Sequence, residues 1–139
     1  MNRRRSIASL LVFSAYPAIV SATTEATAAA QAAARDWLTK LDASDYSGTW
    51  EVAASMFKAA VSAQAWQQAS QSVRAPLGAI RSRTETSATF TRSIPGVPEG
   101  QYVVIQFDTT FENKAKKVET VTVALDRDGA WRVAGYFIK

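Results

Sequence analysis

A change of hydrophobic period halfway along the chain constrains the fold more than any other feature of this sequence. Before Gly78, apolar side chains recur every three to four residues, which is the spacing of one helix face. After Gly78 they alternate, as in strands that bury one face. Helices that precede strands, instead of alternating with them, predict an α+β fold rather than a parallel βαβ sheet.

Three helices are predicted in the first half. The first covers about residues 25–41, the second runs from an N-cap at Ser47 to about Ala60, and the third starts at an N-cap at Ser62. Pro76 and Gly78 end the third helix. All three carry aromatic side chains at helical spacing, so we expect them to pack on the core side of a sheet: Trp37, Trp50, Phe57 and Trp66. The first helix also places these residues on one apolar face: Ala30, Ala34, Trp37, Leu38 and Leu41.

Four antiparallel strands are predicted in the second half. Residues 79–92 form a polar edge strand, residues 95–100 a wide turn, and residues 102–111 a strand with alternating faces. The third strand carries the apolar face through Val121, Val123 and Leu125. The fourth carries it through Trp131, Val133 and Phe137. The predicted architecture is therefore three N-terminal helices packed on a curved four-stranded antiparallel sheet.

The last hairpin turn follows from the alternation. If Leu125 and Trp131 face the same core they pair with each other, which leaves Arg127, Asp128 and Gly129 as a three-residue loop. Gly129 then takes the left-handed conformation of a bulge turn. The same register predicts that Trp131 is a central core residue.

The N-terminal segment has the three zones of a secretory signal peptide. A basic zone at positions 2–5 contains arginine at 3, 4 and 5, a largely apolar run follows at 7–20, and small residues end it at 20–22. We predict cleavage after Ala22, a mature domain of residues 23–139, and a periplasmic or secreted location. The apolar run is bent by Pro17 and is shorter than the ~20 residues of a spanning helix, so no stable membrane span is expected after cleavage.

Charge and composition exclude several functions. All twelve carboxylates follow residue 22, whereas three of the sixteen basic residues precede it, so the mature domain carries about +1 and no nucleic-acid partner is predicted. Lys114, Lys116 and Lys117 are assigned to a solvated hairpin tip. The chain lacks His, Cys and a glycine-rich phosphate loop, which predicts no metal site and no cofactor.

Motifs in both halves resemble a known family. They are the segments 102–105, 111–114, 119–122 and 128–138, with Trp37-Leu38 and Arg74–Gly78 in the helical half. Across residues 29–139 the chain resembles the exported bacterial proteins grouped as domain of unknown function 4019. The resemblance implies no reaction, cofactor or catalytic residue. The predicted architecture is also similar to the cystatin-like and nuclear-transport-factor-like roll, which implies a cone able to hold a small ligand in many members.

Three functions remain open on the sequence. The first is a binding or accessory module for a small apolar ligand or an envelope protein, with these candidate ligand-binding residues: Tyr46, Trp50, Trp66, Gln106 and Tyr136. The second is a small pocket enzyme, an isomerase or dehydratase, in which Asp108 works with Tyr46 or Tyr136. We expect Asp108 to face water, on the strand face opposite the helices, so no catalytic residue is assigned. The third is an envelope structural protein that self-associates through the sheet.

Overall fold

The computed structural model describes residues 18–139, with side chains from Ala22 onward. Its elements, in chain order, are α1 (Ala18–Asp42), α2 (Tyr46–Glu51), α3 (Ser55–Ala60), α4 (Ala63–Arg74), the 3₁₀ helix η1 (Ala75–Leu77), β1 (Ile80–Thr91), β2 (Tyr102–Phe111), β3 (Lys114–Leu125) and β4 (Trp131–Ile138). The strands form one open antiparallel sheet in the order β1-β2-β3-β4. Helices that precede an antiparallel sheet confirm the α+β prediction.

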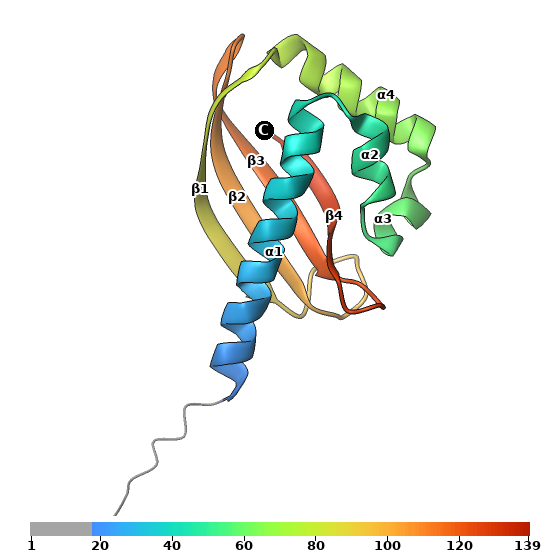
Figure 1. Cartoon of the computed structure of the whole chain (residues 1–139), viewed down its shortest axis with the longest axis vertical. Helices are drawn as coiled ribbons and strands as arrows, with labels where there is room; N and C mark the ends of the chain where they lie inside the picture. The colour runs from blue at the N-terminus through green and yellow to red at the C-terminus, as the bar shows by residue number, and fades with distance from the viewer. Residues whose placement is uncertain (1–17) are drawn as a thin grey trace, which may run out of the picture.

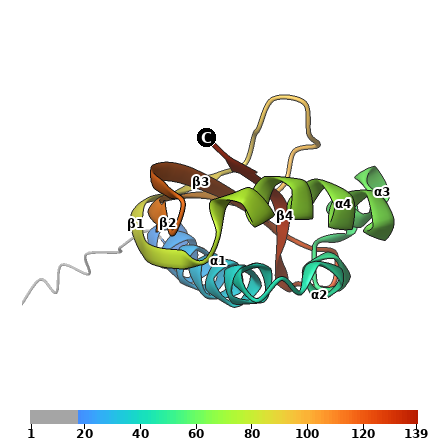
Figure 2. The same cartoon turned by 90° about the horizontal axis from the view of Figure 1, so that it is seen from above.

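The long helix α1 lies along the curved sheet, while the shorter helices gather beside β4 and above the end of α1 (Figures 1 and 2). The apolar face predicted for α1 is confirmed, since its members are at most 2% exposed: Ala30, Ala34, Trp37, Leu38 and Leu41. They pack against the inward side chains of β2, β3 and β4. The concave side of the sheet is therefore filled by α1.

The predicted second helix is wrong, because residues 47–60 form two short helices. Between α2 and α3 the chain takes an extended conformation at Ala54, whose N–H donates to the carbonyl of Val133 on the edge strand β4 at 2.8 Å. The carboxylate of Asp126 then accepts from the N–H and hydroxyl of Ser55, each at 3.0 Å, at the start of α3. Partners about 70 residues away in the sequence thus break the helix.

Helix ends agree with the sequence at two of three predicted points. Ser62 caps α4, as its hydroxyl accepts from Ala65 N–H at 3.1 Å. Gly78, with φ of 76°, follows η1 and ends the helical half. The predicted cap at Ser47 is wrong, because the cap of α2 lies two residues earlier, at Asp45, whose side chain accepts from Gly48 N–H at 3.0 Å.

The β3–β4 hairpin has the predicted register. Leu125 pairs with Trp131, and the Asp126 N–H donates to the Ala130 carbonyl at 2.8 Å, so the loop has three residues. Gly129 has φ of 86°, the left-handed conformation that the bulge turn requires.

A β-bulge in β4 overturns the predicted place of Phe137. Thr122 pairs with Gly135 but Val123 pairs with Val133, so Ala134 is an extra residue that shifts the alternation by one. Tyr136 consequently turns inward, and Phe137 is 57% exposed on the outer face.

The prediction that Trp131 is a central core residue is also wrong, because it is only partly buried at the margin of the core.

The lysine cluster lies at the solvated end of the β2–β3 hairpin, as predicted, but on the first residues of β3 and not in the turn itself. The turn between β2 and β3 consists of Glu112 and Asn113, and Lys114 already pairs with Phe111. A second bulge follows, with Lys116 at φ of 55°. The hairpin tip contacts the end of the helical half, since Asn113 N–H donates to the Leu77 carbonyl at 2.9 Å.

The predicted signal peptide, residues 1–22, lies almost entirely outside the described residues. Among residues 18–139, no helix has both the length and the hydropathy that crossing a membrane requires.

Candidate functional site

A buried carboxylate lies at the centre of the most unusual polar cluster in the described chain. Glu119, on β3, has no exposed surface. Its oxygens accept from the Thr109 hydroxyl at 2.5 Å, the Tyr136 hydroxyl at 2.5 Å and Arg83 Nε at 2.7 Å. Every one of these donors comes from a different strand, so Glu119 joins β1, β2 and β4 through a single side chain.

Two arginines extend this cluster to the end of α1. Arg83 Nη1 and Nη2 donate to the two carboxylate oxygens of Asp42, at 2.8 and 2.9 Å. Arg74 Nη2 donates to Asp42 Oδ1 at 2.9 Å. Glu119, Arg83, Asp42 and Arg74 thus form a continuous ion-pair network.

The pKa values of Asp42, Arg83 and Tyr136 are each shifted in the direction that preserves their bonds. Burial alone would raise the pKa of Asp42, but hydrogen bonds from Arg83 and Arg74 outweigh burial and lower it. Burial would lower the pKa of Arg83, and its bonds to Asp42 and Glu119 raise it instead. Burial and the negative charge of Glu119 both raise the pKa of the Tyr136 phenol. These groups therefore stay in one protonation state through the neutral range.

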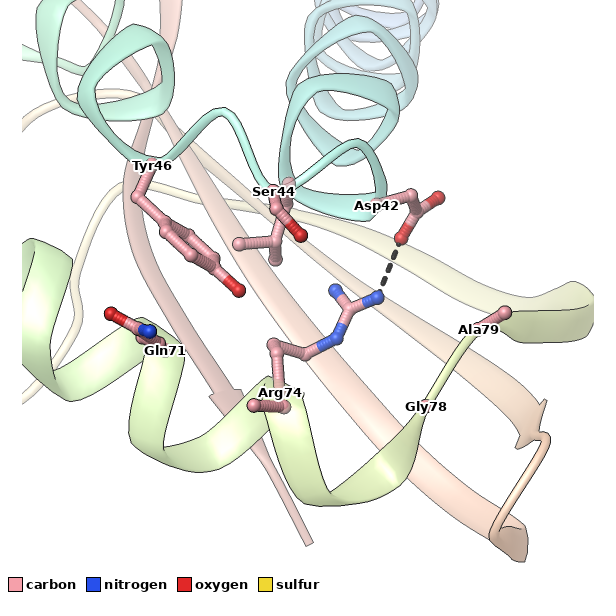
Figure 3. Close-up of a pocket in the computed structure, with 9 residues that line it drawn as sticks. Asp42, Ser44, Tyr46, Gln71, Arg74, Gly78 and Ala79 are labelled. Carbon is pink, nitrogen blue, oxygen red and sulfur yellow. Dashed lines mark hydrogen bonds and ion pairs between the residues drawn. The ribbon is translucent and has the colours of Figure 1, made fainter.

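A pocket of about 430 Å³ opens beside the Arg74 end of the network (Figure 3). It lies between the end of α1, the start of α2 and the C-terminal part of α4. Its lining residues are Leu41, Asp42, Ser44, Tyr46, Gln71, Arg74, Ala75, Gly78 and Ala79. The volume falls in the range of ligand pockets in proteins, ~300–1,000 Å³.

Arg74 is the residue that distinguishes this pocket. Its side chain is only 6% exposed, and its Cζ lies 4.9 Å from the centre of the Phe111 ring. Among the described residues, its buried Nε and Nη1 atoms have no hydrogen-bond partner. Buried polar groups are nearly always paired in native proteins, so two such atoms beside a pocket point to a binding site.

One of the five predicted ligand-binding residues lines this pocket. Tyr46 does, and its side chain points into the same space as Arg74 (Figure 3). Trp66 is buried, with its Nε1 donating to the Thr49 hydroxyl at 2.9 Å, and Trp50 Nε1 donates to the Val61 carbonyl at 2.8 Å. Both indoles therefore tie helices to one another.

The other predicted site residues are separated. Tyr136 packs against Trp37 and donates to Glu119 inside the domain. Gln106 and Asp108 are exposed on the outer face of β2, where the alternation predicted Asp108 to be. The structure does not bring Asp108 together with Tyr46 or Tyr136.

Sequence reasoning missed the ion-pair network, although one signal was available. Glu119 lies two residues before Val121 and four before Val123, so it shares their inward face on β3. A carboxylate on the apolar face of a strand points into the core, so a cation is expected beside it to compensate its charge. Arg83, in contrast, lies on the polar edge strand predicted for residues 79–92, and nothing in the local sequence links it to Glu119.

The network holds no vacant set of metal ligands. Among residues 18–139, no group of three or more acidic side chains is placed to bind a metal ion. Asp42, the carboxylate nearest to the pocket, is held ionised by two arginines, which makes it a poor acceptor for a substrate proton. The arrangement is suited to holding a polar group in place.

Fold and pocket together define an open-sheet α+β domain whose candidate site lies on the helical side, at the end of α1. The chain belongs to the family described as protein of unknown function (DUF4019), whose model matches residues 33–136. The match spans the Arg74 pocket and the whole ion-pair network. No curated protein and no solved structure matches the chain.

Proposed function

We propose that this protein is an exported binding module that holds a small molecule in the Arg74 pocket and performs no reaction on it. The observation that carries the proposal is Arg74 itself, a buried cation beside a pocket with two nitrogen atoms that no described residue pairs. Leaving such donors unpaired costs roughly 1–3 kcal/mol each, and a ligand that pairs them recovers part of that cost.

We place the ligand in the Arg74 pocket and not in the cone that the similarity to the cystatin-like roll implied. α1 packs its apolar face into the concave side of the sheet, so its side chains occupy the centre of the predicted cone. The Arg74 pocket has polar and charged groups on its wall, from Ser44, Tyr46 and Gln71. A ligand with polar groups therefore fits this proposal better than a purely apolar one.

A carboxylate enzyme has less support. Asp108 is exposed on the face away from the pocket, and Asp42 has a lowered pKa because Arg83 and Arg74 hold its charged form. A general base works best when its pKa lies near the operating pH. Neither carboxylate meets the requirement of a poised base inside a pocket.

The proposal of export rests on the basic, apolar and small-residue zones of residues 1–22. Cleavage after Ala22 is compatible with the fold, because the most N-terminal member of the buried core is Ala30. The mature chain would then keep all of the core, the ion-pair network and the pocket. We propose a periplasmic or secreted location on this ground.

Native mass spectrometry of protein purified from the periplasm tests binding. We expect wild-type protein to carry an additional small-molecule mass, and Gln71→Trp to lose it, because the indole would fill the pocket from the exposed side of α4. The matched control is Gln68→Trp, at an exposed position of α4 that does not line the pocket. A bound mass that is equally abundant in Gln71→Trp would place the ligand elsewhere.

A further inference from the structure

Arg74 is the least compensated charge of the ion-pair network. A guanidinium group has five N–H donors, and the one hydrogen bond that Arg74 makes to a described residue runs from Nη2 to Asp42. Asp42 also accepts two bonds from Arg83, so two cations share its single negative charge. An additional acceptor therefore gains more at Arg74 than at Arg83, which already bonds two carboxylates.

The charge balance of the network limits what kind of acceptor fits. Asp42 and Glu119 match Arg74 and Arg83 in number, so the network is close to neutral before anything binds. A single negative charge can pair with Arg74. A doubly charged group such as a phosphate monoester would place a second charge close to the Asp42 carboxylate, which repels it.

The pocket also offers hydroxyl donors and an apolar surface. Tyr46 and Ser44 point toward the same space as the guanidinium group of Arg74 (Figure 3). Among the side chains that the structure describes, the hydroxyls of Tyr46 and Ser44 have no hydrogen-bond partner. Leu41 and Ala75 supply apolar lining next to these polar groups. The site thus combines a cation, hydroxyl donors and a small apolar wall.

We propose that the ligand of this pocket is a small organic monocarboxylate, whose carboxylate group pairs with Arg74 Nε or Nη1 and whose apolar part lies against Leu41 and Ala75. The inference rests on the proposed function, to which it adds the chemical class of the ligand. Both nitrogen atoms are buried, so binding requires a local side-chain movement. NMR of the arginine side chains detects such a movement directly.

The test is a titration of ¹⁵N-labelled wild-type protein, followed through the arginine Nε–Hε resonances. The probes are sodium butyrate, its uncharged counterpart butyramide, and inorganic phosphate, at constant ionic strength. We expect butyrate to shift the Arg74 resonance to saturation. Butyramide and phosphate should each bind at least about tenfold more weakly than butyrate. Equal binding of butyramide, or tighter binding of phosphate, would overturn the assignment to a carboxylate.

Variants separate recognition by Arg74 from general charge. Arg74→Lys keeps the positive charge but removes the guanidinium donors, and we expect about a tenfold loss of butyrate affinity. Because this variant lacks the Arg74 resonance, its titration and that of wild type are compared through the backbone amides of Ser44 and Gln71, which line the pocket. Arg127→Lys, at an exposed position of the β3–β4 turn, is the matched control and should bind butyrate unchanged. If Arg74→Lys does not fold, Tyr46→Phe removes one hydroxyl only and should weaken butyrate about threefold. Unchanged affinity in the folded Arg74 or Tyr46 variant contradicts the inference.

The outcome also separates this inference from the proposed function. If no carboxylate probe binds while periplasmic protein carries an uncharged molecule that Gln71→Trp lacks, the ligand class is wrong and the binding function stands. If the probes fail and no molecule accompanies the protein, both are wrong.

Discussion

Glu119 is the residue whose replacement tests the ion-pair network most sharply. Glu119→Gln keeps the shape of the side chain but leaves Arg83 with Asp42 as its remaining carboxylate partner. Removing one partner of a buried ion pair costs ~3–5 kcal/mol, and we expect about 3 kcal/mol because Asp42 still compensates Arg83. Urea unfolding at neutral pH measures the loss.

The control for this prediction is Asp108→Asn, which makes the same chemical change on the exposed face of β2. It should change the free energy of unfolding by no more than ~0.5 kcal/mol. A Glu119→Gln protein as stable as Asp108→Asn would show that the buried network contributes little to the fold.

Tyr136 gives the network a signature at alkaline pH. Burial and Glu119 raise the pKa of its phenol above the ordinary value of 10.0, so the unfolded chain loses this proton first. The contribution of Tyr136 to stability is therefore complete below pH ~10 and is lost as the pH rises further. Tyr136→Phe should cost ~2 kcal/mol at pH 7, because it removes a hydrogen bond to a charged group.

The measurement is urea unfolding of both proteins between pH 7 and pH 11. The gap in stability between wild type and Tyr136→Phe should narrow above pH ~10. A gap that widens with pH would mean that the folded state favours the ionised phenol, contrary to the structure.

Among the elements, α1 and β4 each contribute a tryptophan to the helical side of the sheet, and the two are buried to different degrees. Trp37 is 2% exposed and contacts Tyr136 and Trp66, whereas Trp131 is partly buried at the margin. Trp37→Ala should cost ~3–5 kcal/mol, the range for large aromatic side chains in cores, and Trp131→Ala clearly less. Thermal unfolding of the two variants measures the two losses of stability. A larger loss in Trp131→Ala than in Trp37→Ala would mean that Trp131 is the central core residue.

The break between α2 and α3 makes α3 depend on Asp126. Its carboxylate accepts from Ser55 at the first turn of the helix, so Asp126→Ala should cost ~1 kcal/mol, as loss of a helix cap does. Amide hydrogen exchange in α3 should quicken. Asp128→Ala is the matched control, because that exposed residue bonds only to its own hairpin. Equal exchange in both variants would contradict a role for Asp126 in holding α3.

Elements with a strong local pattern were predictable from the sequence, and elements set by distant partners were not. The face of α1, the alternation of β2 and the Gly129 loop each follow from residues close in sequence. The break at Ala54 depends on Val133. The outward turn of Phe137 depends on a bulge beside Gly135, and the alternation of apolar residues alone does not predict it. The pocket was missed for the same reason, since Asp42 and Arg74 are 32 residues apart and meet only in the fold.

At the scale of the whole molecule, the two faces of the sheet have different roles. The concave face is occupied by α1 and the buried core, and the outer face exposes Gln106, Asp108 and Phe137 to solvent. The Arg74 pocket lies at neither face but at the junction of α1, α2 and α4. The ion-pair network connects that junction to all strands of the sheet, either directly or through the partners of Glu119.

A crystal structure of protein purified from the periplasm, without a refolding step, tests whether the Arg74 pocket binds a small molecule. We predict density for a small molecule in the pocket lined by Tyr46, Gln71 and Arg74, with an acceptor atom within hydrogen-bond distance of Arg74 Nε or Nη1. Ordered water alone beside Arg74, with the remaining pocket empty in the wild-type crystal, would contradict the proposal of a bound ligand.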